Sequence, residues 1–204
     1  MTLTISEEHL PITLTVPRMT DEEFVEFCSH YPDYFVEVTA EGQVIIMPPN
    51  YSSTSARGNH ITRALGNWAD ADGRGIATES SGGFVLPNGA RRSPDAAWTS
   101  IERLNSQTTS ELRRFWRLCP DFVIELRSTH DRLSTLRAKM QEWVDNGTQL
   151  AWMIDPETRT VEIYRPGPPV ETLADAKTIT AGPPVAGFQL DLERIWNPLP
   201  GLNY

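Results

Sequence analysis

The apolar and polar positions of the first 50 residues predict a helix followed by a β-hairpin. Thr20 and Glu23 have the spacing of a capping box, so a helix is expected to begin near residue 20. Apolar and polar residues then alternate over 34–38 and 43–47, with a glycine-containing turn between them. This pattern is typical of two antiparallel strands.

Apolar residues return at helical spacing over 53–71, which predicts a second helix. Two strands are expected after it, near 75–86 and 92–98. The following stretch, 101–118, is polar and then mixed in character, so we expect a loop or a short helix there.

The clearest unit begins after Asp121. Residues 122–126 form an apolar run that contains a single acid, and residues 150–154 form a second apolar run. A helical pattern over 129–146 separates them, and strand, helix and strand at this spacing predict a parallel βαβ crossover. Residues 160–164 alternate and are expected to pair back on the second run.

The last part of the chain is rich in proline, since eight of the 16 prolines lie from Pro156 onward. We expect a single domain over residues 1–204, with a core at about 20–165. Residues 166–204 then form an extension that wraps around this core. Four residues are its expected docking points: Phe188, Leu190, Leu192 and Trp196.

The formal net charge of −9 argues against a protein that coats nucleic acid nonspecifically, because such proteins neutralise phosphates with Lys and Arg. No apolar run is long enough to span a bilayer. The segment Met1–Leu10 lacks the regions of a signal peptide. The two cysteines, Cys28 and Cys119, have no metal or redox spacing. We therefore expect a cytoplasmic protein with no membrane partner.

Glu125 is the first candidate for chemistry, because it is an acid inside an apolar strand. Alternation places Glu125 and Arg127 on the face opposite Ile124. A strand of this kind is normally covered on both faces, and an unpaired carboxylate there costs several kcal/mol or takes up a proton. Either a basic partner such as Arg127 or a bound cation is expected to compensate it.

Asp95 is the second candidate, since it lies on a predicted strand that can neighbour the Glu125 strand. Two converging carboxylates suit Mg²⁺ or Mn²⁺, which prefer oxygen ligands. Taken alone, an aspartate after a proline is more often a turn residue. Lys139 falls at the edge of the apolar stripe of the helix predicted over 129–146, where it can extend its ammonium toward the sheet. The alternative for Lys139 is a solvated surface side chain.

Several runs in this order resemble a known family. They are YFVEVTAEGQVIIMPP, GNHITRALGNWAD, SPDAAW and VIELRSTHDRLSTLRAKMQEWVDNGTQLAWMIDPETRTVEIYRPG. Together they resemble the Uma-type restriction endonuclease family, a bacterial family within the PD-(D/E)XK nuclease superfamily. The resemblance extends from about Thr15 to Trp196.

The resemblance implies an α/β fold of the restriction-endonuclease type. Its αβββαβ core would have a mixed central sheet, with an extra N-terminal helix and hairpin and the proline-rich extension. Asp95 matches the aspartate of the PD motif, including the preceding Pro94, and Glu125 matches the acid of the (D/E)XK motif. The usual lysine two residues later is absent, and Arg127 stands in its place. In this superfamily the lysine can move to the following helix, where Lys139 fits.

Two further positions follow from the resemblance alone. Glu37 matches an acid of the family's early hairpin, and it would serve as an additional ligand or base. His60 matches a recurrent histidine on the first core helix, although a hydrogen-bonded histidine beside the core would give the same match.

The predicted function is metal-dependent hydrolysis of phosphodiester bonds, with DNA as the substrate that the resemblance implies. Asp95 and Glu125 would bind Mg²⁺ or Mn²⁺, and Lys139, or Arg127 in its stead, would orient the attacking water or stabilise the phosphorus centre. Two alternatives stay open: a binding module that has the nuclease fold without catalysis, and a metal-dependent hydrolase of another phosphoester. A homodimer is compatible with the sequence but is not required by it.

Overall fold

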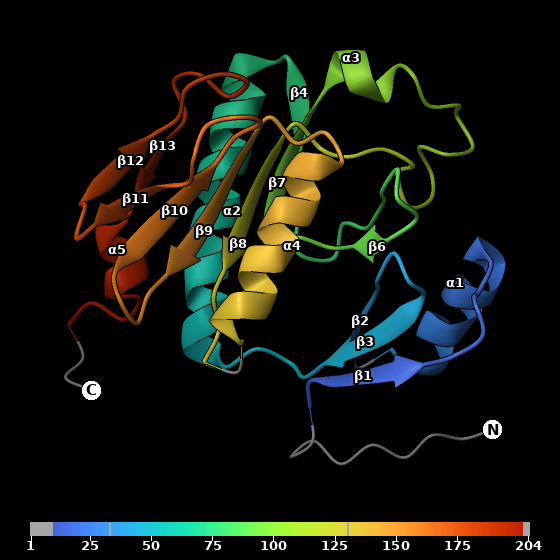
Figure 1. The fold of residues 1–204 in the computed structure, drawn as a ribbon. Helices are drawn as coiled ribbons and strands as arrows, with labels where there is room; N and C mark the ends of the chain where they lie inside the picture. Colours follow the sequence, from blue (N-terminus) through green and yellow to red (C-terminus); the bar gives the residue numbers. More distant parts are fainter. Residues whose placement is uncertain (1–9, 33, 130, 202–204) are drawn as a thin grey trace.

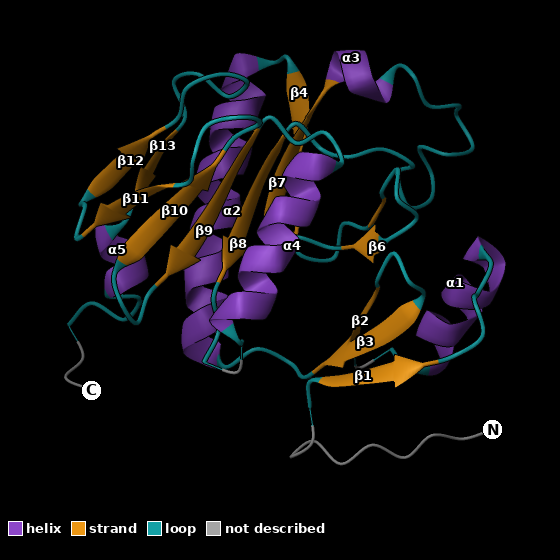
Figure 2. Cartoon of the chain, in the orientation of Figure 1, coloured by secondary structure: helices purple, strands orange, loops and turns teal. Residues whose placement is uncertain are grey.

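The computed structural model describes residues 10–32, 34–129 and 131–201. Its strands form an N-terminal sheet and a larger central sheet, with a small two-stranded sheet near the C-terminus (Figures 1 and 2). Within the described ranges no helix has the length and apolar character needed to cross a bilayer. The segment that was tested for a signal peptide lies largely outside the described residues.

The central sheet has the strand order β11-β10-β9-β8-β7-β4. The pairs β4–β7 and β7–β8 are antiparallel, β8–β9 is parallel, and β9–β10 and β10–β11 are antiparallel. Its strands are β4 (Gly75–Glu79), β7 (Ala96–Ser100), β8 (Phe122–Leu126), β9 (Leu150–Asp155), β10 (Thr160–Tyr164) and β11 (Glu171–Ala174). The parallel pair with its connecting helix is the predicted βαβ crossover.

Two helices cover opposite faces of this sheet, α2 (Ser52–Asp72) and α4 (Leu133–Asp145) (Figure 1). On the α2 side, Ile124 of β8 joins a core cluster with residues of α2. On the α4 side, Val123 packs with Trp143 of α4. The sequential order α2, β4, β7, β8, α4, β9 is the αβββαβ core that was predicted. The alternation of β8 is also confirmed, since it directs Glu125 toward α4.

The N-terminal sheet has the order β1-β3-β2-β6-β5 and carries the predicted hairpin. One of its faces is covered by α1 (Asp21–His30), whose capping box is formed and whose Phe24 is buried among the valines and isoleucines of that face. The strands are β1 (Ile12–Thr15), β2 (Phe35–Val38), β3 (Gln43–Met47), β5 (Phe84–Val85) and β6 (Arg91–Arg92). The other face is turned toward α4 and the central sheet.

The C-terminal extension has more regular structure than the extended wrap that was predicted. It adds β11 to the edge of the central sheet, then forms β12 (Thr178–Thr180), β13 (Gln189–Asp191) and the short helix α5 (Glu193–Trp196). The predicted docking points are confirmed: Phe188, Leu190 and Leu192 are fully buried in the core on the α2 side, and Trp196 packs against it.

Three predicted boundaries were wrong. The strand expected near 75–86 is two strands in different sheets, β4 and β5, because the chain turns before Gly83. A Cβ at Gly83 would lie 2.1 Å from Phe115 Cδ1, so this close approach requires glycine. The strand expected near 92–98 also divides, into β6 and β7, because Pro94 has no N–H to continue a ladder.

The helix expected over 129–146 begins at Leu133, after a turn, and residue 130 lies outside the described residues. The stretch 101–118 contains the short helix α3 (Ile101–Leu104), followed by turns and bends.

Candidate active site

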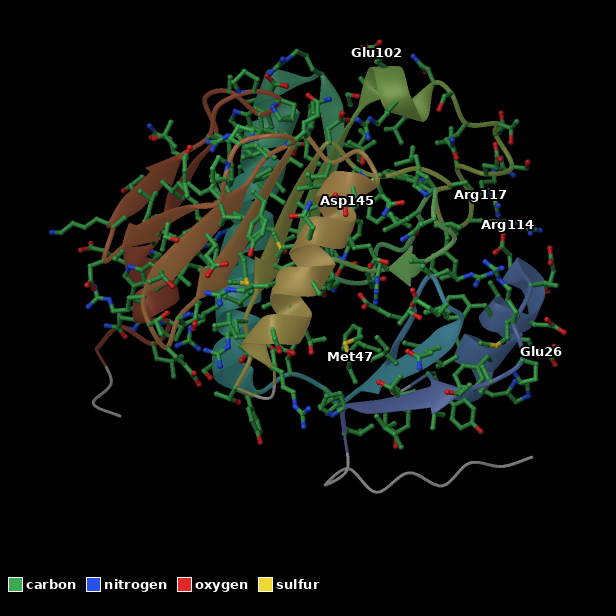
Figure 3. All side chains as sticks on the ribbon, in the orientation of Figure 1. Glu26, Met47, Glu102, Arg114, Arg117 and Asp145 are labelled. Carbon is green, nitrogen blue, oxygen red and sulfur yellow. The ribbon has the colours of Figure 1, made fainter. Side chains whose placement is uncertain are left out.

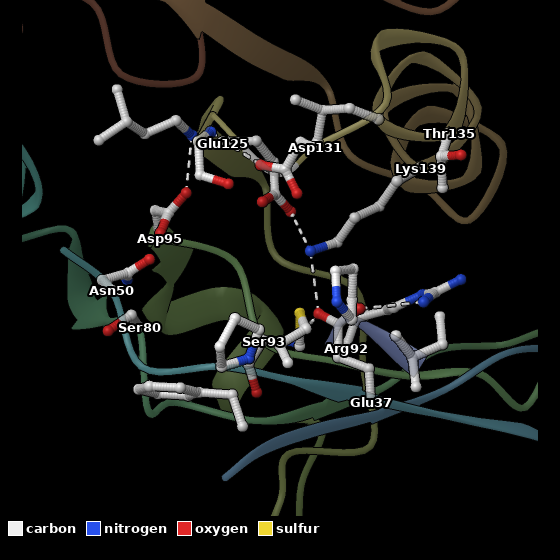
Figure 4. Close-up of a pocket in the computed structure, with 18 of the residues that line it drawn as sticks. Glu37, Asn50, Ser80, Arg92, Ser93, Asp95, Glu125, Asp131, Thr135 and Lys139 are labelled. Atoms are coloured by element: carbon white, nitrogen blue, oxygen red, sulfur yellow. Dashed lines mark hydrogen bonds and ion pairs between the residues drawn. The ribbon is translucent and has the colours of Figure 1, made fainter. Parts of the chain in front are cut away.

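A pocket of about 850 Å³ lies where the N-terminal sheet, the central sheet and α4 meet. Figure 4 shows its charged side chains converging from these three elements. Glu37 comes from β2, Glu125 from β8 and Lys139 from α4, while Arg92 and Asp95 flank the link between the two sheets.

Lys139 connects the two sheets through its ammonium. Its Nζ lies 2.8 Å from Glu125 Oε1 and 2.9 Å from Glu37 Oε1. The side chain can reach both acids because Met140 and Trp143 bury the adjacent stripe of α4 and leave Lys139 at its edge. Burial opposes the charge of Lys139, but the carboxylates of Glu125 and Glu37 outweigh it and raise the pKa of the ammonium above its usual range. Lys139 is therefore a fixed cation, since it does not lose its proton near neutral pH.

Glu125 is held by two donors on one oxygen. The indole N–H of Trp143 donates to Glu125 Oε1 at 2.8 Å, on the same atom that Lys139 contacts. The residue is only 4% exposed, and this burial raises the pKa of the Glu125 carboxyl to about 7, while Lys139 opposes the shift. The charges of Asp95 and Glu37 raise it further.

Asp95 lies beside Glu125 because of the strand register. Ala96 of β7 is paired with Ile124 of β8, so one more step of the antiparallel register brings Asp95 opposite Glu125, with both side chains on one face. Asp95 Oδ2 accepts a hydrogen bond from the Leu126 N–H at 2.7 Å. Burial raises the pKa of Asp95 to about 6, although that hydrogen bond and Lys139 lower it.

Glu37 differs from these two acids because donors surround its carboxylate. Its Oε1 accepts from Lys139 and from the Ser93 N–H at 3.0 Å, and its Oε2 accepts from Arg92 at 3.0 Å. Burial alone would raise the pKa of Glu37, but Lys139 and Arg92 lower it below its ordinary value. Glu37 is thus a fully paired anion that holds the two cations in place.

Arg92 extends this network along α4, to Glu142 one turn beyond Lys139. It contacts Glu142 Oε2 at 2.7 Å as well as Glu37. The described ion pairs join three carboxylates to two cations, and Asp95 lies beside them. With all of these groups ionised, four carboxylates and two cations leave a formal excess of two negative charges. The carboxylates are Glu37, Asp95, Glu125 and Glu142, and the cations are Arg92 and Lys139.

The comparison with family profiles gives a match over residues 21–193, to the Uma2 family described as "Putative restriction endonuclease". The chain belongs to the Uma2 family. The match extends from α1 through β13, includes Glu37, Asp95, Glu125 and Lys139, and agrees with the resemblance seen in the sequence.

A solved structure has the same fold as this Uma2 chain. It is described as the crystal structure of "a putative nuclease belonging to DUF820 from Anabaena variabilis ATCC 29413". The two chains superpose with a TM-score of 0.72 at 20% identity, over 87% of this chain and 97% of the other. A search of curated proteins gave no match.

Two residues predicted from the Uma2 resemblance lie away from this cluster. Arg127 follows the end of β8, and its Nη1 contacts Asp155 Oδ2 at 2.8 Å and Glu157 Oε2 at 3.0 Å. It is therefore not the basic partner of Glu125 that alternation suggested. His60 lies on α2, across the sheet from α4, and its Nε2 is 3.0 Å from the Asp191 carbonyl oxygen. This contact matches the alternative of a hydrogen-bonded histidine beside the core.

Two residues of the cluster were not foreseen as site residues. Trp143 has the apolar character of a packing residue, and the signal for its role is its spacing of one helical turn from Lys139, which places both on the flank of α4 that faces Glu125. Arg92 precedes Ser93-Pro94-Asp95 by one residue, but its contact with Glu37 depends on a sheet pairing that the sequence does not reveal.

The donor set in this Uma2 pocket fits a hard divalent cation. Glu125 is buried and Asp95 is half-buried beside it. In each the second carboxylate oxygen has no hydrogen-bond partner among the described residues. Mg²⁺ commonly uses one or two protein carboxylates and retains several waters. Within the described ranges no cluster of three or more acidic, His or Cys side chains has metal-ligating geometry, so water or substrate would supply the remaining ligands.

Proposed function

We propose that this chain is a metal-dependent endonuclease that hydrolyses phosphodiester bonds, with DNA as its substrate. The observation that carries the proposal is the pair Asp95 and Glu125. The buried Glu125 and the half-buried Asp95 lie opposite each other in a pocket, and the ammonium of Lys139 does not by itself balance their charge. The membership in a restriction endonuclease family supports the same reaction class.

Asp95 and Glu125 would hold the ion, Mg²⁺ or Mn²⁺. When bound, such an ion lowers the pKa of a ligated water and offsets the charge that grows on the phosphate. The raised pKa values of the two acids are consistent with this role, because burial, and to a lesser extent the neighbouring carboxylates, make their charged forms unfavourable without a cation.

Lys139 would act as a permanent positive charge beside the reacting phosphate. Glu125 and Glu37 raise the pKa of its ammonium, which favours the charged form, so we assign to it the role of orienting the attacking water and stabilising negative charge by hydrogen bonding. Because Lys139 occupies the position toward which Glu125 points, we assign to it the role of the motif lysine, rather than to Arg127.

Glu37 and Arg92 would act as positioning residues. Glu37 accepts from Lys139 and from the Ser93 N–H two residues before Asp95, so it fixes the lysine relative to that acid. Arg92 in turn holds Glu37 through its contact with Glu142. We infer that Glu37 contributes through this network and not as a free base.

Plasmid nicking in Mg²⁺ or Mn²⁺ tests the proposal. Wild-type protein should convert supercoiled DNA to open circles, and Asp95→Asn or Glu125→Gln should reduce the rate at least 100-fold. Calorimetric titration with Mn²⁺ should show binding to wild-type protein and not to the double variant.

Two other outcomes would count against the proposal. Absence of both cleavage and metal binding would favour a non-catalytic module with the nuclease fold. Hydrolysis of bis-(p-nitrophenyl) phosphate without any cleavage of nucleic acid would indicate a hydrolase of smaller phosphoesters.

A further inference from the structure

The N-terminal sheet has apolar residues on both faces, and α1 covers only one of them. On the covered face lie Val38, Val44 and Ile46, which are buried against Phe24 of α1. On the other face lie three apolar side chains, Phe35, Ile45 and Met47. Sheets with one solvated face normally alternate apolar with polar residues, so these three need another explanation.

This second face is the floor of the pocket. Cross-strand pairing places Phe35 opposite Met47 and Glu37 opposite Ile45, so the apolar residues and the acid lie side by side on β2 and β3. Figure 3 shows Met47 between the N-terminal sheet and α4. Phe35 remains 38% exposed. Glu37 is two positions after Phe35 on β2, which corresponds to a rise of roughly 6.6 Å along the strand.

A second aromatic residue stands at the rim of the same pocket. Tyr51 precedes α2, lines the pocket and is 60% exposed. In Figure 4 its neighbour Asn50 lies close to Asp95, on the side of the pocket away from Lys139. The pocket therefore has carboxylates along its wall, with exposed aromatic rings on its floor and rim.

The charge of the pocket is unsuited to a long track of phosphates. Its lining contains five acids, Glu37, Asp95, Glu125, Asp131 and Glu142, and three bases, Arg92, Arg132 and Lys139. Arg92 and Lys139 are engaged by the acids, which leaves Arg132 as the basic lining residue with no ion pair among the described residues. Duplex binding commonly depends on many phosphate contacts from Lys and Arg.

We propose that Phe35 and Tyr51 stack an unpaired nucleobase beside the scissile phosphate, so that the preferred substrate is single-stranded nucleic acid. This inference rests on the proposed nuclease function. Aromatic side chains accept any base face, and stacking supplies affinity where phosphate contacts are few. The pocket volume of about 850 Å³ lies within the range of sites that enclose small organic ligands, so it can admit one nucleotide.

Binding and cleavage should be measured separately. Fluorescence anisotropy in EDTA, with a labelled 15-nucleotide oligothymidine and a 15-base-pair duplex of mixed sequence, reports binding without catalysis. We expect tighter binding of the single strand. Phe35→Ala and Tyr51→Ala should each weaken it by roughly 5- to 100-fold, whereas Tyr51→Phe should retain it. Leu173→Ala is the matched control, because Leu173 is 37% exposed on β11 and lies outside the pocket lining.

Three results would overturn this inference. The first is duplex binding as tight as single-strand binding, and the second is unchanged affinity in both alanine variants. The third is a wild-type dimer in light scattering that Phe35→Ala converts to a monomer, since a second copy would then be the occupant of the apolar face. Single-strand binding that depends on Phe35 and Tyr51, without cleavage in Mn²⁺, would instead refute the nuclease function and leave the base site standing.

Discussion

The Lys139 ammonium lies 2.8 Å from Glu125 Oε1, although Lys139 belongs to α4 and Glu125 to β8. In the motif that the sequence resembles, the lysine follows the acid by two residues. Arg127 occupies that place here and contacts Asp155 instead. The cation of the site therefore comes from α4, and its position depends on how α4 packs on the central sheet.

Replacing Lys139 by methionine should reduce nuclease activity at least 100-fold, because a fixed charge beside the phosphate is lost. It should also lower the free energy of unfolding by about 3–5 kcal/mol at pH 8, since the buried Glu125 then has no ion pair among the described residues and Glu37 retains only Arg92. Urea denaturation and plasmid nicking measure the two effects. The matched control is Lys177→Met, because Lys177 is the other lysine of the chain and its side chain is 82% exposed. Equal loss in both variants would contradict the assignment.

Arg127→Ala tests whether Lys139 or Arg127 has the role of the motif lysine. The ion pairs of Arg127 are with Asp155 and Glu157, and Arg127 does not line the pocket, so the activity of the variant should remain within about threefold of wild type. Stability should fall by about 1–3 kcal/mol because Asp155 stays buried without its partner. A loss of turnover equal to that of Lys139→Met, at unchanged stability, would restore Arg127 to the reaction.

Trp143→Phe tests whether the indole N–H positions Glu125. The substitution keeps an aromatic ring in the core but removes the donor at 2.8 Å, so the pKa of Glu125 should rise and the pH–rate profile should shift upward. The turnover at pH 7 should fall about tenfold. Trp152→Phe is the control, since Trp152 is equally buried but packs on the α2 side of the sheet. An identical pH profile in both variants would assign Trp143 to packing alone.

The metal-free protein should be more stable at pH 5 than at pH 8. Burial raises the folded-state pKa of Asp95 from 3.8 to about 6 and that of Glu125 from 4.5 to about 7. Between the unfolded-state and folded-state pKa values of each acid, the folded protein binds more protons than the unfolded protein. The free energy of unfolding therefore falls as the pH rises through this range. Glu37, whose pKa is lowered, loses its contribution only below this window.

The variant Asp95→Asn should reduce this difference by about 1–3 kcal/mol, because the amide does not titrate. Saturating Mg²⁺ should raise the stability of the wild type at pH 8 and have little effect on the variant. Thermal unfolding in EDTA at the two pH values measures the pH dependence of stability, and thermal unfolding in Mg²⁺ measures the stabilisation by the ion. Asp145→Asn, at an exposed position on α4, serves as the control. A wild-type stability that rises from pH 5 to pH 8 would contradict the prediction.

Local signals in the sequence predicted most of the core. The alternation in 122–126 gave the correct face for Glu125, and the βαβ spacing gave the parallel pair β8–β9. The division of 75–86 between two sheets was missed, because it depends on the contact of Gly83 with Phe115 far along the chain. Arg92 was missed for the same reason, since only the pairing of β2 with β6 brings it to Glu37.

The link from β6 to β7 is three residues long, since only Ser93, Pro94 and Asp95 separate Arg92 at the end of β6 from Ala96 at the start of β7. The φ angle of Pro94 is fixed by its ring, so this link is short and stiff. A hinge motion that widened the pocket would pull on Asp95 directly, and one that closed it would push Asp95 toward Glu125. Any relative motion of the two sheets would therefore also change the spacing between the carboxylates of Asp95 and Glu125.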